Sequence, residues 1–298
     1  MTNTYINKYH SLLFFFICFV LNFFKEDLQL NHDINAIICF FLIATIGISH
    51  GALDNQKGLN LFKKLEIKNI TFFYLSYVAL ALLVISCWLI FSKFTLIIFL
   101  LVAAFHFGKE DNVFELRKIK IVNLLHLSRG SLIILAPLYF KTKETVEIFT
   151  ILNVSMGNID ERLIIGFMFL SIFSSFIVNR DFLYSFLDCF SIILLNYTFS
   201  PLVAFTIYFC FLHSIRHSIT LVFELDNKNF FNGAKIFFKK TLPLTFITAI
   251  IFILSFYAIN NYYSLNSSIL KVIFIGLASL TFPHILLEYL IEKYEKRT

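Results

Sequence analysis

Long apolar stretches separated by short polar segments dominate this chain and constrain its fold more than any other feature. A helix needs about 20 predominantly apolar residues to cross the hydrocarbon core of a bilayer. Backbone polar groups must be satisfied within the lipid, which favours helices, and the alternating pattern of a membrane β-barrel is absent. We therefore predict an all-α, polytopic transmembrane helix bundle. Ten apolar segments are expected, at residues 10–24, 34–52, 70–92, 94–108, 119–140, 162–179, 182–199, 201–223, 241–259 and 269–290.

The first, fourth and seventh segments are short for a membrane span, so the expected number of spans is eight to ten. With ten spans, most of the 25 lysine and arginine residues fall on the side that also holds both termini. Positively charged loops favour the cytoplasm, and we therefore expect cytoplasmic N- and C-termini. No repeat or low-complexity linker divides the chain, so residues 1–298 are interpreted as a single domain.

The net charge of +6 does not indicate a nucleic-acid-binding protein, because the basic residues lie in the loops between apolar runs. Charged residues make up 15% of the chain, against about 25% in a typical soluble domain. The five cysteines occur singly, without a CxxC motif, and are interpreted as buried structural thiols.

Four histidines lie in or at the ends of the apolar segments, in three short motifs. They are His50 in Gly-Ile-Ser-His-Gly-Ala-Leu-Asp, His106 in Ala-Phe-His-Phe-Gly, and His213 with His217 in His-Ser-Ile-Arg-His. Ionisable side chains are costly at membrane depth and usually have a functional reason to be there. Neutral imidazole is also the commonest protein ligand for transition metals. The four histidines are therefore candidate metal ligands.

The predicted topology gives these histidines a common depth. The second, fourth and eighth segments all run toward the cytoplasm, and the histidines fall in the cytoplasmic half of each. His213 and His217 are four residues apart, so they lie on one face of a helix. A shared layer is necessary for a single metal site, but the lateral packing of the helices does not follow from the sequence.

Charged residues close to these histidines have more than one interpretation. Asp54 could accept a hydrogen bond from the second ring nitrogen of His50, or it could simply end the helix together with Gly51. Glu110 and Asp111 could act in the same way on nearby rings, although solvation in a loop is expected for at least one of them. Arg216 could extend to the lipid headgroups or bind a carboxylate on a neighbouring helix.

Two further histidines lie at a similar depth. His284, in Phe-Pro-His-Ile-Leu-Leu-Glu, is followed one turn later by Glu288, and metal-ligand, supporting and structural roles all remain open for it. His126 has no accompanying motif, and a structural role is expected. Histidine donors without cysteine suit iron, zinc or copper, whereas magnesium and calcium prefer oxygen. A metal held inside lipid suggests chemistry on a lipophilic molecule.

Taken in this order, the His-Gly-Ala-Leu-Asp, Phe-His-Phe-Gly, His-Ser-Ile-Arg-His and Pro-His motifs resemble those of the Brp/Blh family. These are bacterial and archaeal integral-membrane β-carotene 15,15′-dioxygenases. The resemblance covers about Gly47 to Glu288, and residues 1–33 would then be an N-terminal extension. It implies a multi-pass protein of the cell inner (plasma) membrane.

The resemblance also implies an activity. An Fe(2+) centre with His50, His106, His213 and His217 as ligands would use O2 to cleave the central double bond of β-carotene. The product would be two molecules of all-trans-retinal, which a rhodopsin in the same cell could use.

Three other functions remain open at this point. A membrane di-iron desaturase would carry more histidines, in HxxxH and HxxHH clusters. A metal or proton transporter would spread polar residues through the depth of the membrane. Paired histidines could also bind the haem of a b-type cytochrome.

Overall fold

The computed structural model describes residues 3–25, 32–67, 69, 71–112, 120–157, 160–178 and 181–295, and within these ranges it contains helices and no strand. The N-terminal half contains α1 (Asn3–Phe23), α2 (His32–Leu42), the π-helical turn η1 (Ile43–Gly47), the 3₁₀ turn η2 (Ser49–Leu53), α3 (Asp54–Lys64), α4 (Thr71–Ile90), α5 (Ser92–Glu110), α6 (Val122–Gly130), α7 (Leu132–Phe140) and α8 (Thr142–Ile151). The C-terminal half contains α9 (Glu161–Val178), α10 (Phe182–Thr198), α11 (Pro201–Ile207), the π-helical turn η3 (Tyr208–Ser214), α12 (Ile215–Leu225), α13 (Phe230–Ile259) and α14 (Leu265–Glu295).

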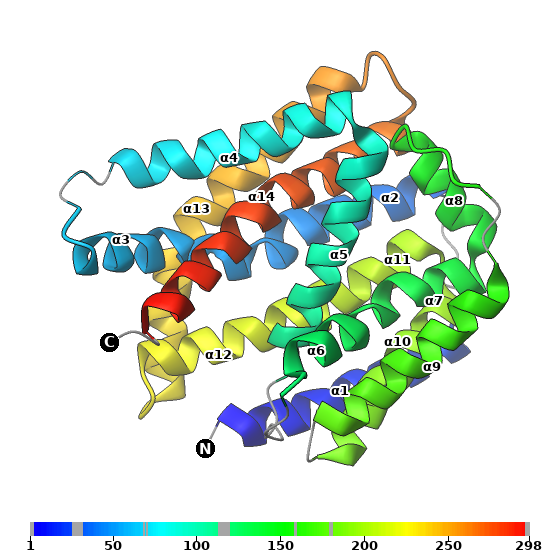
Figure 1. Cartoon of the computed structure of the whole chain (residues 1–298), viewed down its shortest axis with the longest axis horizontal. Coiled ribbons are helices and arrows are strands. Elements are labelled where there is room, and N and C mark those ends of the chain that lie inside the picture. Colours follow the sequence, from blue (N-terminus) through cyan, green and yellow to red (C-terminus); the bar gives the residue numbers. More distant parts are fainter. Residues whose placement is uncertain are drawn as a thin grey trace.

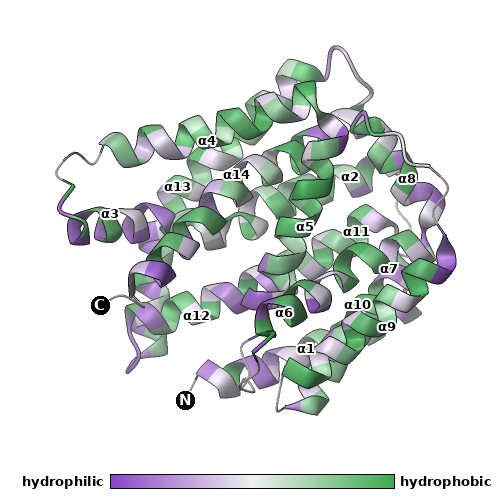
Figure 2. Ribbon diagram, in the orientation of Figure 1, coloured by the Kyte–Doolittle hydropathy of each residue, from purple (hydrophilic) through white to green (hydrophobic). Residues whose placement is uncertain are grey.

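The predicted helical membrane bundle is confirmed. Within the described ranges, nine helical segments are long and apolar enough to cross a membrane, and α10 is a shorter apolar helix of 17 residues. Both termini lie at the same end of the bundle, as predicted (Figure 1). Apolar residues run along the long helices, while hydrophilic residues gather in α3, α8 and the polar ends (Figure 2).

Two predicted boundaries differ from the structure by more than ten residues. The second span was expected to end near residue 52, with Gly51 and Asp54 as a possible helix end, but the chain continues through η2 and α3 to Lys64. The ninth was expected to begin at residue 241, whereas α13 begins at Phe230, where the side chain of Asn229 caps the helix by accepting a hydrogen bond from the amide of Asn232. Both extensions are lysine-rich, which lowers their hydropathy without preventing a helix.

Burial distinguishes central helices from peripheral ones. The segment formed by α11, η3 and α12 is 61% buried over its most apolar window, whereas the corresponding window of α13 is 6% buried. The segment α11–η3–α12 therefore lies at the centre of the bundle, and α13 and α4 present apolar side chains outward. This arrangement is the one expected of helices in contact with lipid.

The crossing of α5 and α6 is unusually close because both helices present glycine. A Cβ atom on Gly108 would lie 1.8 Å from the carbonyl oxygen of His126, and one on Gly130 would lie 1.8 Å from that of Ala104. Small residues let helix backbones approach in this way in membrane proteins. Gly108 is two residues from His106, so this contact helps to fix the position of that histidine.

We expect Gly108→Ala to destabilise the protein strongly, because its new methyl group would meet backbone atoms that cannot rotate away. Overpacking of this kind costs about 1–3 kcal/mol or more. Gly166→Ala in α9 is a matched control, since nothing lies within 4 Å of its added Cβ. Thermal unfolding in detergent should show a lower Tm for the first variant and an equal or higher Tm for the second. Equal Tm values would contradict the close crossing.

Candidate metal centre and apolar cavity

Four segments of the chain each supply two polar residues at a spacing of four. The pairs are His50 and Asp54 from η2 and α3, His106 and Glu110 from α5, His213 and His217 from η3 and α12, and His284 and Glu288 from α14. Residues four apart in a helix lie on the same face, one turn from each other. The bundle brings most of these pairs together at one place. The side chain of His50 lies outside the described part of the structure.

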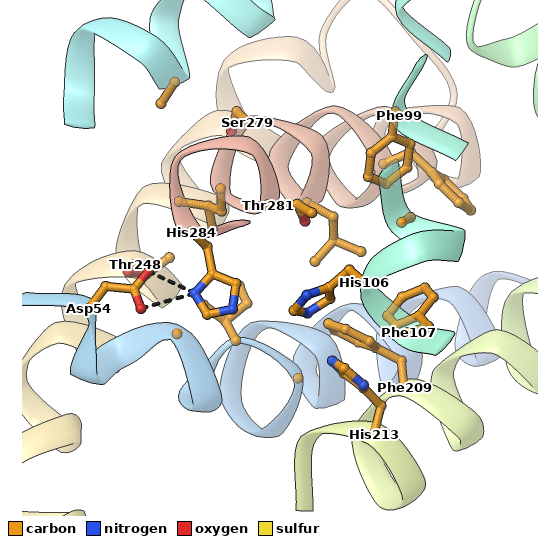
Figure 3. A pocket seen from close by; sticks show the side chains of 18 of the residues that line it. Asp54, Phe99, His106, Phe107, Phe209, His213, Thr248, Ser279, Thr281 and His284 are labelled. Atoms are coloured by element: carbon orange, nitrogen blue, oxygen red, sulfur yellow. Dashed lines mark hydrogen bonds and ion pairs between the residues drawn. The ribbon is translucent and has the colours of Figure 1, made fainter. Parts of the chain in front are cut away.

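Four histidine rings form the centre of this site. The ring of His106 lies 5.3 Å from that of His213 and 5.2 Å from that of His284, centroid to centroid. His217 lies 6.1 Å from His284. All four rings are buried. His106, His213 and His284 point toward one another from three different segments (Figure 3). The structure thus brings together three of the four predicted metal ligands, His106, His213 and His217, and it adds His284.

A carboxylate contacts the Nδ1 atom of three of these rings. Asp111 lies 2.8 Å from His213 Nδ1, and Asp54 lies 2.9 Å from His284 Nδ1. Glu110 lies 3.2 Å from His217 Nδ1. A neutral imidazole that donates from Nδ1 carries its lone pair on Nε2. For His213 and His284, the carboxylate on Nδ1 therefore favours the tautomer in which Nε2 can bind a metal, as outer carboxylates do in many histidine metal sites.

These contacts decide between the alternatives left open for Glu110 and Asp111, whereas the predicted contact of Asp54 with His50 lies outside the described side chains. Glu110 and Asp111 both contact histidines, so the expectation that at least one is a solvated loop residue is wrong. The reason is that α5 extends to Glu110 and carries both acids into the bundle. Asp54 is 3% exposed and accepts hydrogen bonds from His284 and from the hydroxyl of Tyr77.

The π-helical turn η3 explains how one carboxylate serves two groups. Hydrogen bonds from residue i to i+5 widen such a turn and bring residues five apart toward the same face. Tyr208 and His213 have this spacing, and both bind the carboxylate of Asp111, one at each oxygen. π-turns of this kind are common at functional sites.

Arg216 holds the backbone of Asp111 in place and links it to Asp188 on α10. Its guanidinium is fully buried and forms two hydrogen bonds to the Asp188 carboxylate on α10, of 2.8 Å and 3.1 Å. It also donates to the backbone carbonyl of Asp111 at 3.1 Å. Of the two interpretations of Arg216, a carboxylate on a neighbouring helix is confirmed. Burial opposes ionisation of Asp111, but His213 and Arg216 outweigh it and lower the pKa of this carboxyl to about 2.

Glu288 belongs to the site, although the sequence indicated only that it lies one turn after His284. One of its carboxylate oxygens lies 3.7 Å from His284 Nε2 and 3.9 Å from His217 Nε2, and the other lies 4.0 Å from His106 Nδ1. Its position four residues after His284 was the available signal. His126, by contrast, contacts the carbonyl of Gly108 at 3.0 Å, as expected for a structural histidine.

The donor set fits a transition metal. Two groups have one possible ligand atom per residue within 4.8 Å of one another: His106, His284 and Glu288, and Glu110, His217 and Glu288. Imidazole with carboxylate suits iron, manganese or zinc, and two histidines with one carboxylate are the donors of many non-haem iron oxygenases. No cysteine belongs to these groups in the described part of the chain.

An apolar cavity of about 510 Å³ leads to the histidines. His106, His213 and His284 line one part of it, and aromatic residues such as Phe99, Phe107 and Phe209 line the adjoining part (Figure 3). Its lining also includes Val78 and Leu82 on α4 and Ile251 on α13, which are 55%, 57% and 54% exposed. The cavity therefore reaches from the buried site to the outward-facing surface of these two helices.

We expect Asp111→Asn to weaken metal binding about 10- to 100-fold, because it removes the charge that orients His213 while keeping the side-chain shape. Asp160→Asn is a control, since Asp160 is exposed and its side chain accepts a hydrogen bond from the amide of Arg162. Dialysis of the loaded proteins against increasing chelator concentration measures the difference. Identical metal retention in both variants would rule out the orienting role of Asp111.

Comparison with known proteins identifies the family of this chain. No solved structure matches the chain. A protein from uncultured marine bacterium 66A03, named Beta-carotene 15,15'-dioxygenase, is 28% identical over 263 residues, which cover 86% of this chain and 94% of that protein. The profile of the family described as Beta-carotene 15,15'-dioxygenase matches residues 41–292, which include every histidine and carboxylate of the site. This chain therefore belongs to the Beta-carotene 15,15'-dioxygenase family of enzymes.

Proposed function

We propose that this protein cleaves β-carotene at its central 15,15′ double bond with O2, and that each product is a molecule of all-trans-retinal. The observation that carries this proposal is the buried histidine and carboxylate cluster beside an apolar cavity. A metal held at this place faces a space suited to a hydrocarbon. The reaction breaks one carbon–carbon double bond and gives one oxygen atom of O2 to each carbon, so it needs no external reductant.

Fe(2+) is the proposed metal, with His50, His106, His213 and His217 as the ligands that the sequence predicts. Three of these side chains lie in the cluster, and the Asp111 carboxylate on Nδ1 supports ligation through Nε2 by His213. When bound, iron supplies the activation of O2. The protein's own contribution is to hold neutral imidazoles in one orientation and to keep water from the reacting carbons.

The cavity lining supports a carotenoid substrate. Its walls are mainly aliphatic and aromatic side chains, which bury a polyene without leaving polar groups unsatisfied. Phe107 and Phe209 lie beside His106 and His213, where they would flank the central part of the chain (Figure 3). We infer that the substrate enters from the lipid bilayer between α4 and α13, where cavity-lining residues are exposed.

The proposed function includes a cellular location and a partner that uses the product. We propose the inner (plasma) membrane as the location and a rhodopsin as the consumer of the retinal. The clustering of polar groups beside an apolar cavity favours this function over a transporter, which needs polar groups along a pathway through the membrane.

Expression in a β-carotene-producing bacterium tests the proposed activity. We expect the cells to lose their orange colour and to accumulate retinal, detected by chromatography. His213→Ala should abolish retinal formation while the protein remains in the membrane at a normal level. His126→Ala is the comparison, because this ring contacts a backbone carbonyl outside the cavity lining. Persistent colour with well-folded, iron-supplied protein would refute the function.

Ile251→Trp tests the entrance. The larger ring should narrow the opening at α13 and lower kcat/KM for β-carotene about tenfold, equivalent to about 1.4 kcal/mol, without changing the bound metal. Ile253→Trp, on the same helix, is the control, since Ile253 is 44% exposed and does not line the cavity. Equal kcat/KM values in vesicles would exclude this route.

A further inference from the structure

The site contains more metal donors than one reactive ion would use. Apart from His50, four histidines and the carboxylates of Glu110 and Glu288 gather within it. An iron ion that must also accept O2 keeps coordination positions open, so it does not use all six of these side chains. The surplus donors require a separate explanation.

The donors separate into two layers. The first members of the helical pairs, His106, His213 and His284, line the apolar cavity. The second members, Glu110, His217 and Glu288, follow one turn later and do not line it. One turn of helix advances about 5.4 Å, so the second layer lies beyond the first as seen from the cavity.

Glu288 joins the two layers. It belongs to both groups of donors whose atoms lie within 4.8 Å of one another. One oxygen lies between His284 Nε2 and His217 Nε2, at 3.7 Å and 3.9 Å, and the other oxygen is 4.0 Å from His106 Nδ1. In enzymes with two metal ions about 3.5–4 Å apart, a shared carboxylate of this kind can contact both ions.

The negative charge around the two layers favours the binding of divalent metal. Four carboxylates surround the histidines: Asp54, Glu110, Asp111 and Glu288. Lys57 contacts Glu288 at 3.6 Å, whereas the guanidinium of Arg216 forms its two side-chain bonds with Asp188. Buried carboxylates are stable only when opposite charge or hydrogen bonds compensate them. Lys57, Arg129 and Arg216 compensate part of this negative charge, and bound divalent metal would compensate the rest.

We propose that Glu110, His217 and Glu288 bind a second divalent transition-metal ion, next to the ion of the histidine layer and bridged to it by Glu288. Imidazole with two carboxylates suits Fe²⁺, Mn²⁺ or Zn²⁺. His217, predicted from the sequence as a ligand of a single iron, then serves the second ion. This inference builds on the proposed metal centre, but it concerns the number of ions and not the substrate.

The proposal is tested by measuring how many metal ions the full-length protein binds. The protein is purified in detergent and loaded with Fe²⁺ in the absence of oxygen. We expect two ions per chain in the wild type and one in Glu110→Gln, which keeps the side-chain shape. Glu292→Gln is the matched control: Glu292 lies one turn beyond Glu288 on α14 and pairs with Lys109. It should retain two ions. One ion in the wild type would overturn the proposal and leave Glu110 and His217 as a simple ion pair.

A second measurement uses the wild type alone, in case the variant does not fold. Co²⁺ is added stepwise to metal-free protein and followed by electron paramagnetic resonance. Two neighbouring ions couple magnetically, so the signal per cobalt should fall as the second equivalent binds. Saturation at one equivalent, without coupling, would overturn the proposal. Retinal formation by a protein with one ion would refute only the second site, and two ions without retinal formation would refute only the proposed activity.

Discussion

The burial of carboxylates against imidazoles is the interaction on which the rest of this structure depends. Each acid taken into an apolar bundle loses its hydration, and it is tolerated only where a compensating partner is held in place. Asp111 meets this condition through His213, Tyr208 and the guanidinium that binds its backbone. Asp54 meets it through His284 and Tyr77. The positions of α4, α5, η3, α12 and α14 relative to one another are therefore set by polar contacts as much as by apolar packing.

The same contacts link stability to the chemistry of the site. Arg216 does not lie in the cavity lining, yet it connects α12, α10 and the residue that binds His213. Removing one partner of such a buried pair leaves an uncompensated charge, which typically costs about 3–5 kcal/mol. In a bundle of this kind, the residues that orient the histidine rings also hold the helices together.

Much of the fold followed from the sequence because hydropathy over about 20 residues is a strong local signal. All ten apolar segments correspond to helices, and the pairing of Arg216 with a carboxylate was one of two stated alternatives. The predicted helix boundaries were wrong where helices continue beyond the apolar run, as in α3 and at the start of α13. Lysine there reduces hydropathy but has good helix propensity.

The site was less predictable because it depends on lateral packing. Asp111 and His213 are 102 positions apart, and Asp54 and His284 are 230 apart, so no local pattern could pair them. The π-turn that aligns Tyr208 with His213 also has no clear sequence signal. The repeated spacing of four was visible, however, and reading it on all four segments would have drawn Glu288 into the site.

The opening of the cavity on α4 and α13 affects how the reaction rate depends on the amount of substrate in the membrane. A molecule that enters between these helices comes from the hydrocarbon phase, so its effective concentration is its mole fraction in the bilayer and not its amount per volume of cell. Dilution by other lipids then acts like a competitor, and the thickness and fluidity of the membrane enter the rate. On the proposed route, enzyme and substrate would meet by diffusion in the two dimensions of the bilayer.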